Sequence, residues 1–214
     1  MYGLKYGPRD FYIWIDKGGT GKTTIALALY FKLKEMNVPY CIVTNQTTSL
    51  LSKVLNKDQD LFITKPKFSF SNINFPKIID LEGHSKDSFI SDVVANCKHI
   101  IVPVLATFAE MQASISSILA IKELNPKTCF TIVVNKVNKE SEFIEIRKTL
   151  LKNLNFLNEN SFFRLPFSKS LENMFIEKQS IKKMMEETVL KRYHFKKVEA
   201  SIALLCNHLI ANFN

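Results

Sequence analysis

The stretch Lys17-Gly18-Gly19-Thr20-Gly21-Lys22-Thr23-Thr24 follows a short apolar run, Phe11–Ile15, and precedes a segment with apolar residues at helical spacing. A strand, a glycine-rich loop and a helix in this order are typical of a phosphate-binding loop. The glycines let backbone amides approach phosphate oxygens without a Cβ clash, at a helix start whose dipole favours anions. Lys22 is expected to reach the β- and γ-phosphates of a nucleotide, and the Thr23 hydroxyl to bind Mg²⁺.

Short β-rich runs alternate with longer helical segments along the rest of the chain. The expected strands are Phe11–Ile15, Tyr40–Val43, Lys67–Phe70, Lys77–Asp80, His99–Val104, Cys129–Val134 and Phe162–Leu165. The expected helices are Thr23–Met36, Ser49–Leu55, Ser85–Cys97, Ala109–Glu123, Glu140–Asn153, Leu171–Glu177 and Met184–Leu209. This alternation predicts a doubly wound α/β fold, with a mostly parallel sheet and helices on both faces. Because no linker or repeat interrupts it, residues 1–214 are expected to form a single P-loop domain.

The composition is that of a globular protein, with 46% hydrophobic and 23% charged residues. No run of about 18 apolar residues is present, and the residues before the first strand are not expected to form a signal peptide. The four cysteines, which are widely spaced and include no CxxC pair, are expected to be small buried thiols in a reducing cytosol; they are Cys41, Cys97, Cys129 and Cys206.

A second motif, Ile78-Ile79-Asp80-Leu81-Glu82-Gly83, places a carboxylate at the end of an apolar strand. Asp80 can hold Mg²⁺ through water, and the amide of Gly83 can meet the γ-phosphate. The alternative is an aspartate that merely caps a helix after the strand.

The phosphate loop also has two unusual positions. Asp16 stands where the first glycine of such loops is expected, and a second lysine, Lys17, precedes the double glycine. The stretch resembles the deviant Walker A motif, KGGxGK[ST]T, of the ParA/MinD family of ATPases. The resemblance covers about residues 11–181 and implies that Lys17 crosses a dimer interface to the ATP of a partner subunit. It also implies a catalytic group of Lys17, Lys22 and Asp80.

The same resemblance suggests a site for the base. Asn135 would hydrogen-bond the base, and Pro166 and Phe167 would line its pocket. The sequence Asn135-Lys136-Val137-Asn138 differs from the guanine-reading NKxD motif at its last position. Because Asn138 lacks the carboxylate that accepts both guanine N–H groups, ATP is expected rather than GTP.

One stretch departs from the family pattern. ParA-like proteins carry a D-x-D-P-Q-type segment after the second strand, and its first aspartate helps to position the attacking water. Here the chain reads Val43-Thr44-Asn45-Gln46-Thr47, with no carboxylate. An amide or hydroxyl can orient water but cannot accept its proton. Either hydrolysis is slow, or Glu82 or another group compensates.

The charge balance favours a polyanionic partner. Lysine and arginine exceed the acids by nine, although an AT-rich genome would also enrich lysine. Candidate phosphate contacts gather in the C-terminal helical region, where Glu199 interrupts one face; they are Lys182, Lys183, Lys191, Arg192, Lys196 and Lys197. An ordinary solvated helix face is the alternative interpretation.

The resemblance leads to an expected function. A cytoplasmic homodimer with ATP and Mg²⁺ would bind non-specific DNA on the nucleoid, in plasmid or chromosome partition, and a ParB-like or adaptor protein would stimulate hydrolysis. A MinD-like ATPase that cycles on membranes is an alternative, but the apolar turns Ile202–Phe213 contain no lysine or arginine and favour core packing. An iron–sulfur reductase or a P-loop enzyme that processes small molecules is a further alternative.

Overall fold

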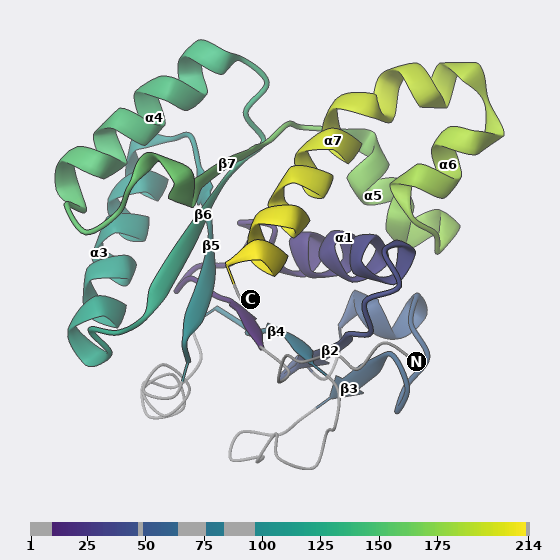
Figure 1. The fold of residues 1–214 in the computed structure, drawn as a ribbon, viewed down its shortest axis with the longest axis horizontal. Coiled ribbons are helices and arrows are strands. Elements are labelled where there is room, and N and C mark those ends of the chain that lie inside the picture. The colour runs from purple at the N-terminus through teal and green to yellow at the C-terminus, as the bar shows by residue number, and fades with distance from the viewer. Residues whose placement is uncertain (1–9, 47–48, 64–75, 84–96, 213–214) are drawn as a thin grey trace.

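Seven parallel strands form one sheet in the order β3-β2-β4-β1-β5-β6-β7 (Figure 1). The computed structural model describes residues 10–46, 49–63, 76–83 and 97–212. The strands are β1 Phe11–Ile13, β2 Cys41–Thr44, β3 Leu61–Ile63, β4 Lys77–Asp80, β5 His99–Leu105, β6 Cys129–Asn135 and β7 Phe162–Leu165. The chain therefore has the predicted parallel α/β fold.

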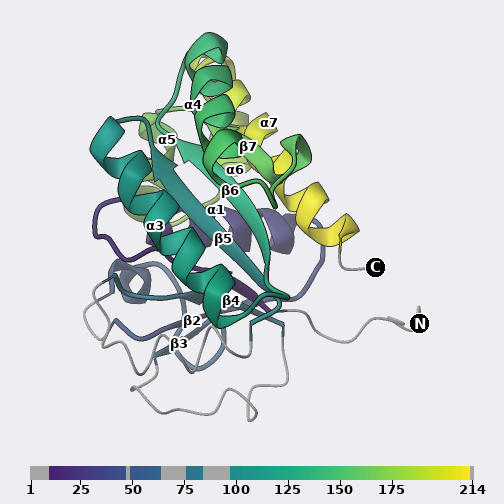
Figure 2. The same ribbon diagram turned by 90° about the vertical axis from the view of Figure 1, so that its left-hand side faces the viewer.

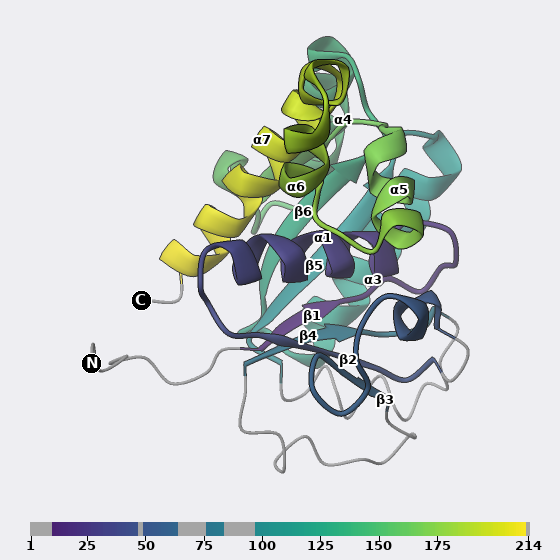
Figure 3. The ribbon, with the colours of Figure 1, turned by 90° about the vertical axis from the view of Figure 1, so that its right-hand side faces the viewer.

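Helices cover both faces of the sheet, which confirms the doubly wound architecture. One face carries α3 (Phe108–Leu124) and α4 (Glu140–Asn153), which lie in front of the strands in Figure 2. Figure 3 shows the other face, with α1 Lys22–Glu35, α5 Lys169–Glu177, α6 Ile181–Glu187 and α7 Val189–Ala211. Two short 3₁₀ turns, η1 (Leu50–Lys53) and η3 (Glu159–Ser161), complete the helical elements of the described residues.

Consecutive residues of a strand pack into two separate hydrophobic cores, one on each face of the sheet. In β4, Ile78 packs with α1 and the C-terminal helices, while Ile79 packs on the side of α3 and α4. In β5, Ile101 faces the first core and Val102 the second. Since successive side chains of a strand point to opposite faces, both must be apolar when both faces are covered. This is why the strands appear in the sequence as continuous apolar runs.

The end of the chain corrects one prediction. A single long helix was expected over Met184–Leu209, but α6 ends at Glu187 and α7 begins at Val189. Thr188 lies between them with extended dihedral angles, and its side chain accepts a hydrogen bond from the backbone N–H of Lys191. This threonine N-cap starts a new helix. The described chain therefore ends in three helices, α5, α6 and α7, rather than in the two that were predicted.

Most other element bounds agree with the sequence. The helix Glu140–Asn153 has the predicted bounds, and α1 starts one residue earlier than predicted. Strand β3 lies in a segment of weak periodicity and was not predicted. The expected strand Lys67–Phe70 lies outside the described residues, as does all of the expected helix 85–97 except its last residue.

The cysteines contradict the expectation of uniform burial. Cys41, Cys97 and Cys206 are buried, but Cys129 is exposed. Cys129 is the first residue of β6, and the buried part of that strand begins with the next residue, Phe130. Within the described segments, no three His, Cys, Asp or Glu residues are grouped as a metal site would require.

No helix in the described part of the chain combines the length and apolar character needed to cross a membrane.

Candidate nucleotide-binding site

The glycine-rich loop joins the carboxyl end of β1 to the first turn of α1, in the middle of the sheet. Gly19 and Gly21 have φ angles of 76° and 96°, which explains why glycine is needed at both positions. Gly21 is the N-cap of α1, so the unpaired amides of the first helical turn face the loop. Such a helix start favours an anionic group.

A cavity of about 500 Å³ lies over this loop. Its walls include most of the predicted nucleotide-binding residues: Gly18, Gly19, Thr20, Gly21, Lys22, Thr23, Thr24, Gly83, Asn135 and Phe167. The structure adds residues that the sequence did not single out as site residues: Gln46, Lys136, Ser168, Leu171 and Glu172. Pro166 does not line it and instead contributes to a separate groove with Arg164 and Lys197.

Lys22 lies at the floor of the loop and is 6% exposed. Its ammonium donates hydrogen bonds to the carbonyl oxygens of Lys17, at 2.5 Å, and Ile15, at 3.4 Å. Burial lowers the pKa of Lys22, and the carboxylates of Asp80 and Asp16 oppose this shift. A nearby phosphate would supply a stronger counter-charge than these carbonyls.

Thr23 and Asp80 come together although 57 residues separate them in the chain. The Thr23 hydroxyl donates a 2.8 Å hydrogen bond to Oδ2 of Asp80. Asp80 is fully buried, its Oδ1 has no hydrogen-bond partner, and burial raises its pKa to about 7. A hydroxyl and a buried carboxylate with an unsatisfied oxygen suit Mg²⁺, which prefers hard oxygen ligands, so these residues fit the predicted metal site.

Lys17 is held by two contacts. Its ammonium forms an ion pair with Oε1 of Glu110 at 2.5 Å, at the start of α3. Its backbone lies against Gly83, where an added Cβ would come 2.7 Å from the carbonyl carbon of Lys17. Lys17 therefore lies beside the cavity, and its ammonium is directed to the α3 side.

The residues of this site fall within a region shared with a known family. The model of the CobQ/CobB/MinD/ParA nucleotide binding domain matches residues 12–181, which is most of the chain. The chain belongs to this family. The matched range includes the glycine-rich loop, Asp80, Gly83 and Asn135.

Solved structures of ParA/MinD-type proteins share the fold. The septum site-determining protein MinD from Pyrococcus horikoshii, complexed with Mg-ADP, has a TM-score of 0.68 at 14% identity, over 94% of this chain and 96% of that chain. A proposed plasmid partition protein from Borrelia burgdorferi, bound to AMPPNP, has a TM-score of 0.62 at 14% identity, over 94% and 99%. Apo McdA from Cyanthece has a TM-score of 0.67 at 12% identity, over 94% and 99%. Comparison with curated protein sequences gives no match.

The loop after β2 is where this ParA/MinD-family chain departs from the expected pattern. Thr44 is buried, and its hydroxyl accepts a hydrogen bond from the N–H of Gln46. The side-chain Oδ1 of Asn45 accepts a 2.8 Å hydrogen bond from the backbone N–H of Glu82. In this stretch without a carboxylate, the Asn45 side chain thus ties the loop to the segment after Asp80.

Asn135 contacts the glycine-rich loop directly. Its Nδ2 donates a 2.8 Å hydrogen bond to the carbonyl oxygen of Thr20, and its Oδ1 is buried without a partner. Its contact with a base stays a prediction. Asn138, which stands at the last position of the guanine-like motif, lies in the groove with Arg164 rather than in the cavity.

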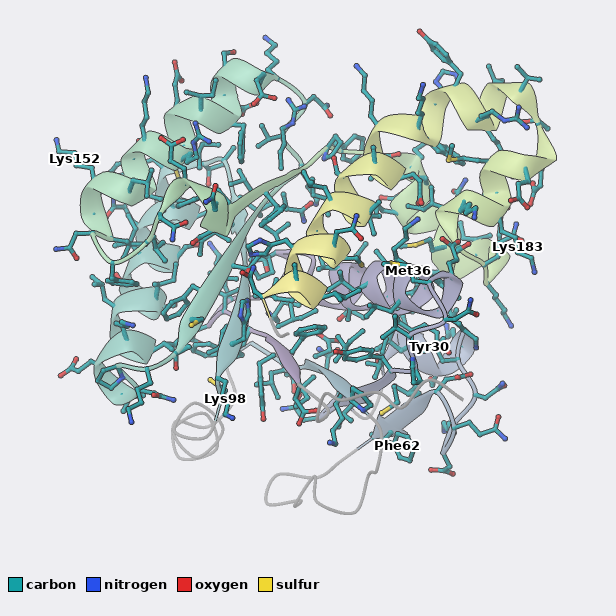
Figure 4. The ribbon with its side chains drawn as sticks, in the orientation of Figure 1. Tyr30, Met36, Phe62, Lys98, Lys152 and Lys183 are labelled. Carbon is teal, nitrogen blue, oxygen red and sulfur yellow. The ribbon has the colours of Figure 1, made fainter. Side chains whose placement is uncertain are left out.

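The six predicted DNA contacts lie on α6 and α7. Lys191 forms ion pairs with Glu177 and Glu187, at 3.0 and 2.6 Å. The other five are exposed: Lys182, Lys183, Arg192, Lys196 and Lys197. Figure 4 shows Lys183 at the outer edge of α6. Glu199, which interrupts this basic face in the sequence, forms an ion pair with Lys32 of α1.

Proposed function

We propose that this chain is an ATPase of ParA type, formed by a single P-loop domain, that dimerises with ATP and then binds DNA without sequence preference. ATP and Mg²⁺ would bind in the cavity over the glycine-rich loop, with Thr23 and Asp80 as the metal-binding residues. Mg²⁺ bound there would neutralise charge on the transferring phosphoryl group. Two relatives of the same fold hold AMPPNP and Mg-ADP, which supports a nucleotide as the ligand of this cavity.

Dimerisation is proposed from the resemblance of the phosphate loop. Lys17 stands at the position whose lysine reaches the partner's nucleotide in ParA/MinD proteins. Its ammonium is held by one partly exposed ion pair, which is weak enough to exchange for a phosphate. Hydrolysis, stimulated by a ParB-like or adaptor protein, would dissolve the dimer.

DNA binding is proposed from the set of six cations that α6 and α7 carry, called the basic face below. Five of the six are exposed, and Glu199, which interrupts them in the sequence, is already neutralised by Lys32. The chain as a whole has a net charge of +9. A dimer would present two such faces, which raises affinity for a long polyanion through multivalency. In a cell, this would place the ATP-bound dimer on the nucleoid, where it would position plasmid or chromosomal DNA.

The experiment is a titration of a labelled duplex of arbitrary sequence by fluorescence anisotropy. Protein is added without nucleotide, with ADP, and with ATP and Mg²⁺, at two salt concentrations. Binding is expected with ATP only, and it is expected to be lost in Lys17→Ala and Lys22→Ala. The absence of DNA binding in every nucleotide state would refute the proposal.

Two surface variants test the basic face itself. The double variant Lys196→Ala/Lys197→Ala removes two exposed cations. In a plot of the logarithm of the DNA-binding constant against the logarithm of the salt concentration, the steepness of the slope should fall by about one for each phosphate that these lysines neutralise. Lys148→Ala/Lys152→Ala on α4 is the matched control, because it removes two exposed cations outside α6 and α7. Equal effects of the two changes would show that the face has no specific role.

A second candidate function is cycling on an anionic membrane. Apolar side chains at the start of α7 are strongly exposed beside the same cations: Val189 at 80%, Leu190 at 67% and Tyr193 at 79%. Exposed apolar groups flanked by lysines are typical of surfaces that bind lipid head groups. The last turns of α7 cannot serve this purpose, because Val198, Ile202, Leu205 and Leu209 are buried. Flotation with vesicles containing anionic lipid, with and without ATP, distinguishes this candidate from DNA binding.

A further inference from the structure

The order of the strands shows which residues of the cavity wall lie on which side of the glycine-rich loop. The wall residues fall on two sides of the central glycine-rich loop. Gln46 and Glu82 follow β2 and β4 on one side, while Lys136, Phe167 and Glu172 follow β6 and β7 on the other. If the base lies on the β6–β7 side, as predicted, the phosphate chain ends on the β2–β4 side. The γ-phosphate would therefore lie near Gln46 and Glu82.

Carboxylates are scarce at this end of the cavity. Among the described residues, the acidic side chains that line it are Glu82 and Glu172, and Glu172 is on the base side. Asp80 is fully buried and accepts a hydrogen bond from Thr23, which suits it to metal binding rather than to proton transfer with solvent water. Glu82 is exposed at the cavity wall, so its carboxylate is accessible to water.

The backbone of Glu82 is fixed on two sides. Its N–H donates to Oδ1 of Asn45 at 2.8 Å, which ties it to the loop after β2. The next residue, Gly83, has no room for a Cβ because the backbone of Lys17 lies against it. The Cα of Glu82 is therefore held at the cavity wall, and its side chain can approach the γ-phosphate end of the cavity from there.

We propose that Glu82 is the general base for ATP hydrolysis in this chain and that Asn45 is its positioning residue. The inference rests on the proposed function, since it assumes that ATP occupies the cavity. The oxygen of water forms a bond to the γ-phosphorus, and the bond from that phosphorus to the β,γ-bridging oxygen breaks. The electron pair leaves with ADP, and the water proton passes to the carboxylate of Glu82 and then to solvent. Glu82 thus supplies the carboxylate that the loop after β2 lacks.

The test compares Glu82→Gln with wild type in single-turnover phosphate release, with protein in excess over ATP. The release rate is expected to fall by about 10²-fold or more, because glutamine cannot accept a proton. Binding of a fluorescent ATP analogue should change by less than about twofold, since no predicted ground-state phosphate contact is removed. Sedimentation should show the variant accumulating as an ATP-bound dimer. Glu145→Gln, an exposed change on α4, is the control and should behave as wild type.

Asn45→Ala tests the positioning role. Hydrogen exchange of the Glu82 amide should become faster in the nucleotide-free variant, because its acceptor is gone, while Glu82→Gln leaves that amide protected. The hydrolysis rate should also fall, with nucleotide affinity retained. Asn45→Asp, which restores an acceptor oxygen, should recover the protection of the amide.

The possible failures are distinct. Hydrolysis by Glu82→Gln within about threefold of the wild-type rate, with ATP bound normally, overturns the inference and leaves the proposed function intact. Absence of phosphate release by the wild-type protein also overturns it, even where ATP and DNA bind. Failure of the wild-type protein to bind the ATP analogue refutes the proposed function itself.

Discussion

The Thr23 hydroxyl donates a 2.8 Å hydrogen bond to Oδ2 of Asp80, joining the first turn of α1 to the end of β4. The other oxygen of Asp80 is buried with no partner. In the absence of a cation, the ionised form of Asp80 is therefore poorly compensated, and its pKa rises to about 7. A cation bound beside Asp80, as proposed, would compensate this charge.

Asp80→Asn should therefore change how stability depends on pH. An acid whose pKa is raised on folding binds a proton more tightly in the folded state, so its contribution to stability is present at low pH. This contribution falls between about pH 4 and pH 7, by at most roughly 1.4 kcal/mol per pH unit. Asparagine keeps an acceptor for Thr23 and removes the titration. In denaturant unfolding without metal, the variant should lose this slope and be more stable than wild type at pH 8.

The same substitution should abolish stabilisation by Mg²⁺ and ATP together. Thermal unfolding with and without both ligands measures this effect. If the stability of Asp80→Asn depends on pH as that of the wild type does, the titration of Asp80 is not the cause of this pH dependence.

Much of the fold and part of the site could be predicted because their signals are local. A doubly covered sheet needs continuous apolar strands, and a helix start that binds phosphate needs glycines, so β5 and the loop Gly18–Thr24 are visible in the sequence. The break at Thr188 was missed because a threonine N-cap competes weakly with the helical pattern around it.

Some contacts between distant segments could not be predicted. The ion pair between Lys17 and Glu110 depends on how α3 packs beside the glycine-rich loop. Adjacent residues also separate in space: Phe167 lines the cavity, whereas Pro166 faces another groove. The order of the strands is therefore needed to decide which residues near a motif belong to the site.

Gly83→Ala should destabilise the nucleotide-free protein. The new Cβ would lie 2.7 and 2.8 Å from the carbonyl carbon and oxygen of Lys17, so the backbone must shift. Overpacking of this kind costs about 1–3 kcal/mol of unfolding free energy. Gly18→Ala is the control in the same unfolding experiment, since a Cβ added there would have nothing within 4 Å. Equal stability of the two variants would contradict the contact.

Asn135→Ala should weaken nucleotide binding by loosening the glycine-rich loop. The change removes the 2.8 Å hydrogen bond to the carbonyl oxygen of Thr20. Loss of one buried hydrogen bond costs about 1 kcal/mol, which corresponds to about a fivefold loss of affinity in calorimetric titration with ATP. Asn138→Ala, which alters the neighbouring groove only, should bind ATP as wild type does. A stronger loss with Asn138→Ala would mean that the cavity and the groove have been assigned the wrong roles.

Glu110→Gln should increase the fraction of ATP-bound dimer. In the nucleotide-free chain, the ammonium of Lys17 is 2.5 Å from Oε1 of Glu110, so in the proposed dimer this lysine would have to leave a carboxylate to reach the partner's nucleotide. Removing the charge of Glu110 lowers that cost, while a partly exposed ion pair contributes no more than about 1 kcal/mol to folding stability. Sedimentation velocity with a non-hydrolysable ATP analogue should then show dimers at lower protein concentration than wild type needs.

The control for this change is Glu159→Gln, which breaks the ion pair with Arg147, on the α4 side of the sheet. It removes the same charge without touching Lys17, so the dimer fraction should stay at the wild-type value. In the double variant Lys17→Ala/Glu110→Gln the gain should disappear, because the lysine that benefits from release is absent. If the dimer fraction is still increased in the double variant, the effect of Glu110 comes from its charge on the surface and not from its ion pair with Lys17.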